Sequence, residues 1–151
     1  MVCVRACLSG KTVNIKKLVE HAVIPKYAKP GDAAMDLVAT SVNYDPSTDT
    51  YIYGTGLSME IPTGYVGMIY PRSSVYKTAV VLANQTGVVD SKFRGEVKVL
   101  MRRDSSLRDI YNVGDRIAQI MIIECPHITF KEVEEIDMTG DRGGGFGSTG
   151  K

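Results

Sequence analysis

The chain has 151 residues, of which 44% are hydrophobic and 23% are charged, and its formal net charge is +1. These values are ordinary for one soluble globular domain that is long enough to bury a core. A net charge this small provides neither a basic field for nucleic acid nor an acidic field for a cationic partner. We therefore expect recognition at a local site and no stable nucleic-acid complex.

Cysteine usage and hydropathy indicate the compartment. Cys3, Cys7 and Cys125 are odd in number and have neither a disulfide framework nor zinc-like spacing, which favours a reducing compartment. No stretch approaches the roughly 18 apolar residues of a membrane span, and the N-terminus lacks the apolar segment of a signal peptide. We expect a soluble intracellular protein without a membrane partner, and the sequence does not distinguish cytoplasm from nucleus.

In chain order, the pattern predicts three parts: a flexible N-terminal stretch over residues 1–11, a β domain over 12–139 and a flexible glycine-rich segment over 140–151. The β domain shows many short strand-like runs and no convincing helical period, which is typical of an all-β sandwich or barrel. One or two helical turns are expected after Pro71, because proline suits the first helical position. The predicted strands cover residues 13–19, 36–42, 51–53, 57–61, 65–70, 79–83, 96–101, 116–124 and 128–133.

The segment 84–95 lies between two of these predicted strands and reads as a hairpin, with glycines where the backbone must turn or be approached closely. It carries a carboxylate, Asp90, and an aromatic ring, Phe93. An exposed hairpin edge offers alternating N–H and C=O groups that can read the edge of a planar heterocycle. The alternative is an ordinary hairpin in which Asp90 caps a turn and Phe93 packs in the core.

Two later features also carry functional signals. The run 117–123 is apolar on both alternating faces except at Gln119, which indicates an inner strand or a subunit interface. The glutamine is either satisfied by backbone groups or directed into a polar pocket. The segment from Gly140 to Gly150 is too poor in apolar residues to fold alone. Its Arg142, Phe146, Ser148 and Thr149 supply the parts of an anion-binding lid over a stacked base, and the alternatives are a mobile end or an RNA-binding arginine-glycine segment.

Five stretches together resemble, in order and spacing, the five sequence motifs of the trimeric deoxyuridine triphosphatases (dUTPases). The resemblance runs from about Ala28 to the C-terminus. Departures occur at Ala34-Met35, where Gly-Tyr is frequent, at Ser74-Val75, where Gly-Leu is frequent, and at Phe93, where tyrosine is commoner; they alter packing around the site more than its chemistry. The stretches are 30–37, 71–74, 84–95, 114–119 and 142–150.

The resemblance implies a β jelly roll of the β-clip type that assembles as a threefold homotrimer, with each active site built from three chains. The hairpin would come from one subunit, the stretches with Arg72, Ser73 and Gln119 from a second, and the tail from the third. The implied reaction is Mg²⁺-assisted hydrolysis of dUTP to dUMP and pyrophosphate, which keeps uracil out of DNA and supplies dUMP for thymidylate synthesis.

The resemblance also implies roles for the hairpin residues. Asp90 would hold the 3′-hydroxyl and act as general base on the water that attacks the α-phosphorus. A carboxylate is a weak base at neutral pH, so positioning and charge stabilisation would carry most of the rate. Phe93 would lie against the sugar and exclude a 2′-hydroxyl. Asn84 and the backbone of Gly87, Val88 and Val89 would read the uracil edge, against which cytosine leaves buried polar groups unpaired.

The remaining implied contacts involve the phosphates. Arg72, Ser73, Ser74 and Gln119 would hold the phosphate chain, while Asp36, Asp115 and Arg116 would support the site. From the tail, Arg142, Ser148 and Thr149 would bind the γ-phosphate, and Phe146, beside Gly147, would stack on uracil. The sequence has no carboxylate cluster suited to caging a metal, so Mg²⁺ is expected on the triphosphate with several waters and no direct protein ligand.

Two other functions fit a jelly roll. In dCTP deaminase, a relative of the same fold, the catalytic glutamate would fall at Leu100 and an arginine at Lys77. Leucine cannot shuttle protons, which disfavours deamination. A non-catalytic nucleotide-binding or regulatory module is the second alternative, and the filled catalytic positions argue against it.

Overall fold

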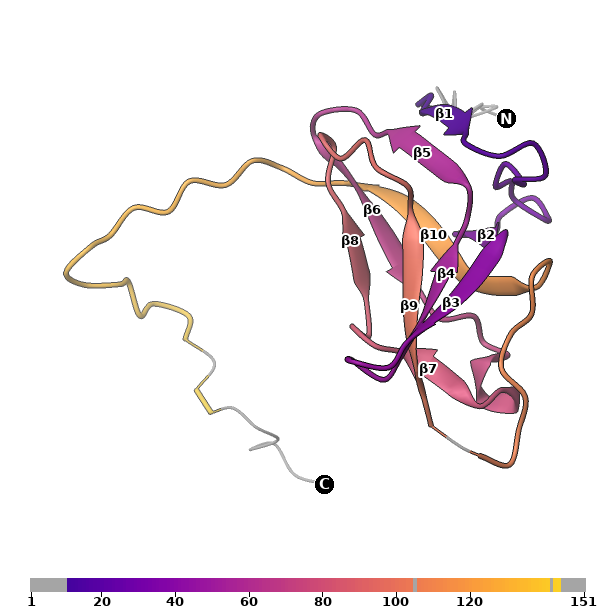
Figure 1. Ribbon diagram of the computed structural model, residues 1–151. Helices are drawn as coiled ribbons and strands as arrows, with labels where there is room; N and C mark the ends of the chain where they lie inside the picture. The colour runs from indigo at the N-terminus through magenta and orange to yellow at the C-terminus, as the bar shows by residue number, and fades with distance from the viewer. Residues whose placement is uncertain (1–10, 105, 142, 145–151) are drawn as a thin grey trace, which may run out of the picture.

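The computed structural model describes residues 11–104, 106–141 and 143–144, and Figure 1 shows its body of strands with an extended segment leaving it. In the described part, all regular structure is β except one short 3₁₀ helix. The elements are β1 (Asn14–Lys17), β2 (Met35–Val38), β3 (Ser41–Asp45), β4 (Thr50–Gly54), β5 (Leu57–Glu60), β6 (Tyr65–Tyr70), η1 (Val75–Lys77), β7 (Val80–Leu82), β8 (Gly87–Val89), β9 (Lys98–Arg103) and β10 (Arg116–Glu124).

Two four-stranded sheets form the body, in the orders β2-β10-β6-β8 and β3-β4-β9-β7, and a two-stranded sheet joins β1 to β5. Every strand pairing is antiparallel. Buried side chains from both four-stranded sheets form one cluster, to which Leu37, Ile69 and Ile120 contribute from one sheet and Tyr53 and Met101 from the other. Two sheets around a shared core are the sandwich that the strand pattern predicts.

The predicted strand over 36–42 is two strands in the structure. The chain passes from one sheet to the other between β2 and β3. The Ala39 N–H donates to the Asp115 carbonyl, and the next amide, from Thr40, donates to the Gly54 carbonyl. The first partner directly precedes β10 of one sheet and the second ends β4 of the other, which explains why a continuous apolar run is interrupted.

The two strands predicted to flank the hairpin are confirmed, but the prediction of a simple turn between them is wrong. β7 and β9 pair antiparallel, with Leu82 opposite Met101. The segment between them is not a simple turn, because it crosses to the other sheet, where β8 pairs with β6. Strand periodicity detects the flanks, whereas a three-residue strand in another sheet carries no separate signal in the sequence.

β10 lies between β2 and β6, as the apolar run on both its faces predicts for an inner strand. Ile117, Ala118 and Ile120 have no exposed surface. The helical turn expected after Pro71 corresponds to η1. No helix among the described residues is long and apolar enough to cross a membrane.

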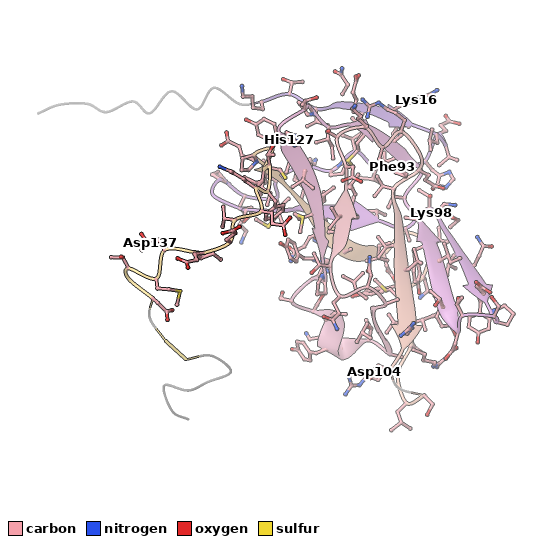
Figure 2. The ribbon with its side chains drawn as sticks, turned by 90° about the vertical axis from the view of Figure 1, so that its left-hand side faces the viewer. Lys16, Phe93, Lys98, Asp104, His127 and Asp137 are labelled. Carbon is pink, nitrogen blue, oxygen red and sulfur yellow. The ribbon has the colours of Figure 1, made fainter. Side chains whose placement is uncertain are left out.

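The strand predicted over 128–133 is wrong. Residues 125–141 leave the body as an extended segment without a strand, and Figure 2 shows Asp137 far from the sheets. A strand needs a paired edge, and this segment pairs with none among the residues that the structure describes. Five large apolar side chains in it are exposed: Ile128, Phe130, Val133, Ile136 and Met138. We call residues 125–141 the arm.

Tyr53→Phe tests the core. The fully buried Tyr53 hydroxyl donates to the Tyr111 carbonyl at 3.1 Å. Its loss should cost about 1 kcal/mol of unfolding free energy at pH 7, measured by urea titration. Burial raises the pKa of Tyr53 to about 12. Because the folded-state pKa exceeds the ordinary tyrosine value of 10.0, the wild type loses this contribution as pH rises from 10 towards 12, and the difference in unfolding free energy between the two proteins should narrow.

Tyr27→Phe is the matched control, since Tyr27 is 54% exposed. Equal stability of wild type and Tyr53→Phe at pH 7 would contradict the assignment of this hydrogen bond to the core.

Candidate active site

The first pocket lies beside β8 and has a volume of about 340 Å³. It brings together all six residues that the sequence places at the hairpin: Asn84, Gly87, Val88, Val89, Asp90 and Phe93. Four further lining residues escaped the sequence analysis, namely Ile69, Glu96, Val97 and Lys98. Glu96, Val97 and Lys98 directly follow the predicted turn, so their place in the sequence could have indicated them. Ile69 is near the pocket only because it lies opposite Gly87 in the pairing of β8 with β6.

β8 is an edge strand, because among the described elements it pairs only with β6. Its free edge therefore presents unpaired backbone donors and acceptors. Gly87 keeps this strand close to β6, since a Cβ built there would lie 3.0 Å from the Ile69 Cβ. The Val88 side chain is 62% exposed, so the strand is accessible from its outer side. An accessible backbone edge is the feature needed to read a heterocycle.

Asp90 follows the last residue of β8 and opens a tight turn in which the Phe93 N–H donates to the Asp90 carbonyl at 3.0 Å. The Asp90 side chain lines the pocket and makes no hydrogen bond or ion pair with the described residues. Its two oxygens are therefore available to a ligand. Phe93 is 43% exposed and lines the same pocket, so its ring is not a core residue.

The second pocket, of about 610 Å³, lies at β2 and the start of β10. It brings together five predicted residues: Asp36, Arg72, Ser73, Arg116 and Gln119. Lys26 and Lys29, which the sequence analysis did not select, also line it. The lining holds four basic side chains against the two carboxylates of Asp32 and Asp36, an excess of two positive charges. Such an excess favours a polyanion.

Asp36 holds two arginines in this pocket. Its Oδ1 accepts from Arg72 Nε at 2.7 Å, and its Oδ2 accepts from Arg116 Nη1 at 3.2 Å. Arg72 also donates through Nη1 to Ser74 Oγ at 3.1 Å. The Arg72 and Asp36 side chains are 22% and 26% exposed, so this ion pair is partly shielded from water. The pair fixes the Arg72 guanidinium before any anion arrives.

Gln119 both hydrogen-bonds to a backbone group and lines a polar pocket, the two alternatives that the sequence left open. Its Nε2 donates to the Pro71 carbonyl at 2.9 Å, which ties the loop carrying Arg72 and Ser73 to β10. The same side chain lines the second pocket. Asp115 lies outside both pockets, where its Oδ2 accepts from the Asn112 N–H at 2.7 Å and shapes the turn before β10.

The two pockets share no residue and lie toward opposite ends of β6. Val89 is opposite Gly67, and Asp90 continues past that end of the ladder because β8 is antiparallel to β6. Arg72 follows the other end of β6, at Tyr70, which is opposite Gln119. Arg72 is five positions after Gly67 in the chain, which corresponds to roughly 16 Å of extended backbone. One chain thus holds Asp90 and Arg72 in separate places.

The predicted tail residues Arg142, Phe146, Gly147, Ser148 and Thr149 lie outside the described residues. Within the described part, no three His, Cys, Asp or Glu side chains gather as a metal site. Both oxygens of Asp36 already accept hydrogen bonds from arginines. The described side chains supply a free carboxylate at one pocket and an excess of cations at the other.

A family model described as dUTPase matches residues 20–150. The chain belongs to the dUTPase family. Two relatives named deoxyuridine 5′-triphosphate nucleotidohydrolase, from Rhodococcus erythropolis and Helicobacter hepaticus, are each 39% identical to it. The first alignment covers 92% of this chain and 86% of the relative, and the second 91% and 88%.

Solved dUTPase structures are similar to this family member over most of its length. The dUTPase of Staphylococcus bacteriophage 80alpha, solved with dUpNHpp, matches with a TM-score of 0.79 and 27% identity, over 94% of this chain and 100% of the phage chain. A mutant dUTPase from phage phi11 of S. aureus, described for its structural Mg(II) ion, matches with a TM-score of 0.69 and 25% identity, over 83% and 98%. The jelly roll inferred from the motifs is thereby confirmed.

Arg72→Lys should weaken binding of inorganic tripolyphosphate about tenfold, because lysine cannot keep the contacts to Asp36 and Ser74 while offering further donors to an anion. Isothermal titration calorimetry measures the affinity. Arg108→Lys is the control, since Arg108 lies outside both pockets and donates to the Tyr76 carbonyl. Equal losses in the two variants would show that the guanidinium geometry of Arg72 is not the determinant.

Proposed function

We propose that the chain hydrolyses dUTP to dUMP and pyrophosphate, in active sites shared between the subunits of a homotrimer. The observation that carries this proposal is the separation of a base-sized pocket with a free carboxylate from a cationic pocket on the same chain. A triphosphate nucleotide needs both, and a neighbouring copy can bring its cationic pocket to the first chain's Asp90. The names of the relatives and the dUTP analogue in the phage structure support the same reaction.

In the first pocket, the free edge of β8 would read the acceptor, donor, acceptor edge of uracil through its backbone, with Asn84 nearby. Cytosine presents a different pattern and would leave buried groups unpaired, which is an effective basis for rejection. Phe93 would pack on the deoxyribose and leave no room for a 2′-hydroxyl. The exposed position of its ring at the pocket is consistent with this role.

Asp90 would accept the 3′-hydroxyl hydrogen bond and orient or deprotonate the water that attacks the α-phosphorus. Its free oxygens suit this role, because a carboxylate held by cations would be occupied. The bond from the α-phosphorus to its bridging oxygen breaks as the water oxygen bonds to phosphorus, and pyrophosphate leaves with the electron pair. Precise placement of the water supplies most of the acceleration.

Arg72, Ser73 and Gln119 of a second subunit would bind the phosphate chain. Asp36 holds Arg72 in place, so little reorganisation is needed when phosphate charge develops. Mg²⁺ would arrive on the triphosphate with several of its water ligands kept. When bound, the ion neutralises phosphate charge.

Surfaces outside the two pockets support assembly. The arm exposes five large apolar side chains, and an apolar pocket of about 470 Å³ lies on the body, lined among others by Val13, Ile15, Ile24 and Tyr65. Apolar surface of this extent is normally covered by a partner. Arg142, Phe146, Gly147, Ser148 and Thr149 would close over the nucleotide as a lid from the third subunit.

Deamination of dCTP is the less favoured alternative. Leu100, at the position of the deaminase glutamate, is 42% exposed on β9 and has no group to transfer a proton. Lys77, at the position of the deaminase arginine, lies over the Tyr76 ring at 5.7 Å from its centroid.

A nucleotide panel tests the reaction. With Mg²⁺ present, pyrophosphate should be released from dUTP and not from dTTP, dCTP or UTP, because only deoxyuridine satisfies both the β8 edge and Phe93. Product chromatography identifies the base. Conversion of dCTP to a uracil nucleotide would favour the deaminase, and no reaction with any of the four would leave a nucleotide-binding module.

Subunit complementation tests the shared site. Asp90→Asn should lower kcat about a hundredfold or more with nucleotide binding retained, and Arg72→Ala should also be nearly inactive. Co-assembled trimers of the two variants should recover activity, because some sites then combine an intact Asp90 with an intact Arg72 from another chain. Trimers assembled from two differently tagged Asp90→Asn chains are the control. Failure to recover activity in verified mixed trimers would place each site within one chain.

A further inference from the structure

We propose that Arg94 is a positioning residue that sets the conformation of the Asp90–Gly95 turn and thereby the discrimination between deoxyribonucleotides and ribonucleotides. The inference rests on the proposed function, in which Phe93 meets the sugar. It concerns a residue that reaches neither the base nor the phosphates in that proposal. Its action is on the backbone that carries the Asp90 carboxylate and the Phe93 ring.

The Arg94 guanidinium gathers two carbonyls of the turn. Its Nη1 donates to the Ser91 carbonyl at 2.7 Å and to the Phe93 carbonyl at 2.9 Å. Carbonyl dipoles that point at one donor repel one another unless a cation lies between them. The positive charge of Arg94 therefore stabilises a turn geometry in which both carbonyls face the same side.

The same residue attaches the turn to β5. Arg94 Nη2 lies 3.6 Å from Glu60 Oε1, and the Ser58 hydroxyl donates to the Arg94 carbonyl at 2.7 Å. Glu60 is held in turn by Asn14 of β1, whose Nδ2 donates to Oε2 at 2.8 Å. The side chain and the backbone of Arg94 thus both connect the turn to a strand of another sheet.

The Phe93 ring fits against the backbone next to this connection. A Cβ built on Gly95 would lie 2.7 Å from the ring's Cζ and 3.0 Å from its Cε2, so the ring occupies the space that a side chain at position 95 would need. Figure 2 labels Phe93 in the upper part of the body, near Lys98, with which it lines the pocket beside β8. Arg94 holds the carbonyl of Phe93 itself, and Gly95, which has no side chain, leaves room for the Phe93 ring.

The turn has few other restraints. Asp90, Lys92, Phe93, Arg94 and Gly95 are all exposed, so little apolar burial holds them. The one backbone hydrogen bond inside the turn joins the Phe93 N–H to the Asp90 carbonyl. Removing Arg94 should therefore loosen this turn locally while the buried core and the fold remain intact.

The experiment compares Arg94→Met with Lys92→Met, which removes the same charge from the same turn but no described contact. The ratio of kcat/KM for dUTP to that for UTP should fall about tenfold in Arg94→Met, because a displaced ring no longer excludes the 2′-hydroxyl. It should be unchanged in Lys92→Met and intermediate in Arg94→Lys, which keeps a cation near the carbonyls. Melting temperatures should differ little.

An unchanged ratio in Arg94→Met would overturn the proposal, and an equal fall in Lys92→Met would assign the effect to charge alone. Hydrogen exchange of the Phe93 amide gives a readout without substrate, and it should be faster in Arg94→Met than in Lys92→Met. If the wild type did not hydrolyse dUTP, the proposed function would fail while this exchange still tested the turn. Identical exchange in both variants would overturn the positioning role.

Discussion

The antiparallel pairing of β6 with β8 on one side and β10 on the other sets the geometry of the functional residues. Register in a sheet with a buried face is strongly specified, because a one-residue slip would turn core side chains outward. Gly67 opposite Val89 and Tyr70 opposite Gln119 therefore fix which end of β6 carries each pocket. The carboxylate and the arginine are kept apart by backbone hydrogen bonds, not by any feature of their own side chains.

Electrostatic preparation differs between the two pockets. In the cationic pocket, Asp36 neutralises part of the charge of Arg72 and Arg116 while fixing their orientation, and the lining still keeps a positive excess. In the pocket beside β8, Asp90 is left without a protein partner among the described residues. A basic side chain paired with Asp90 would occupy the carboxylate oxygens. Because Arg72 lies at the other end of β6, the Asp90 oxygens stay available to a ligand. In the shared site that we propose, the two pockets that serve one nucleotide therefore come from different chains.

The sequence predicted much of this structure because several signals were local. Strand periodicity located β6 at its observed bounds, and glycines with Asp90 and Phe93 located the pocket at β8. The crossing of 84–95 into the second sheet was not predictable, since it depends on pairing with β6, a partner about twenty residues away. Glu96 and Lys98 follow the segment directly in the chain, but only the folded path of 84–95 shows that they line its pocket. Residues 128–133 have strand composition, yet composition cannot reveal that no strand in the described part of the chain pairs with them.

The arm has a consequence for how the stability of this protein is defined. Its exposed Ile128, Phe130 and Ile136 gain little from the folding of their own chain, so in the homotrimer that we propose their burial free energy becomes available only when another copy covers them. Folding and association are then linked by mass action, and the melting temperature becomes a function of protein concentration. A dilute sample would unfold at a lower temperature than a concentrated one, with no change in any covalent or solvent condition.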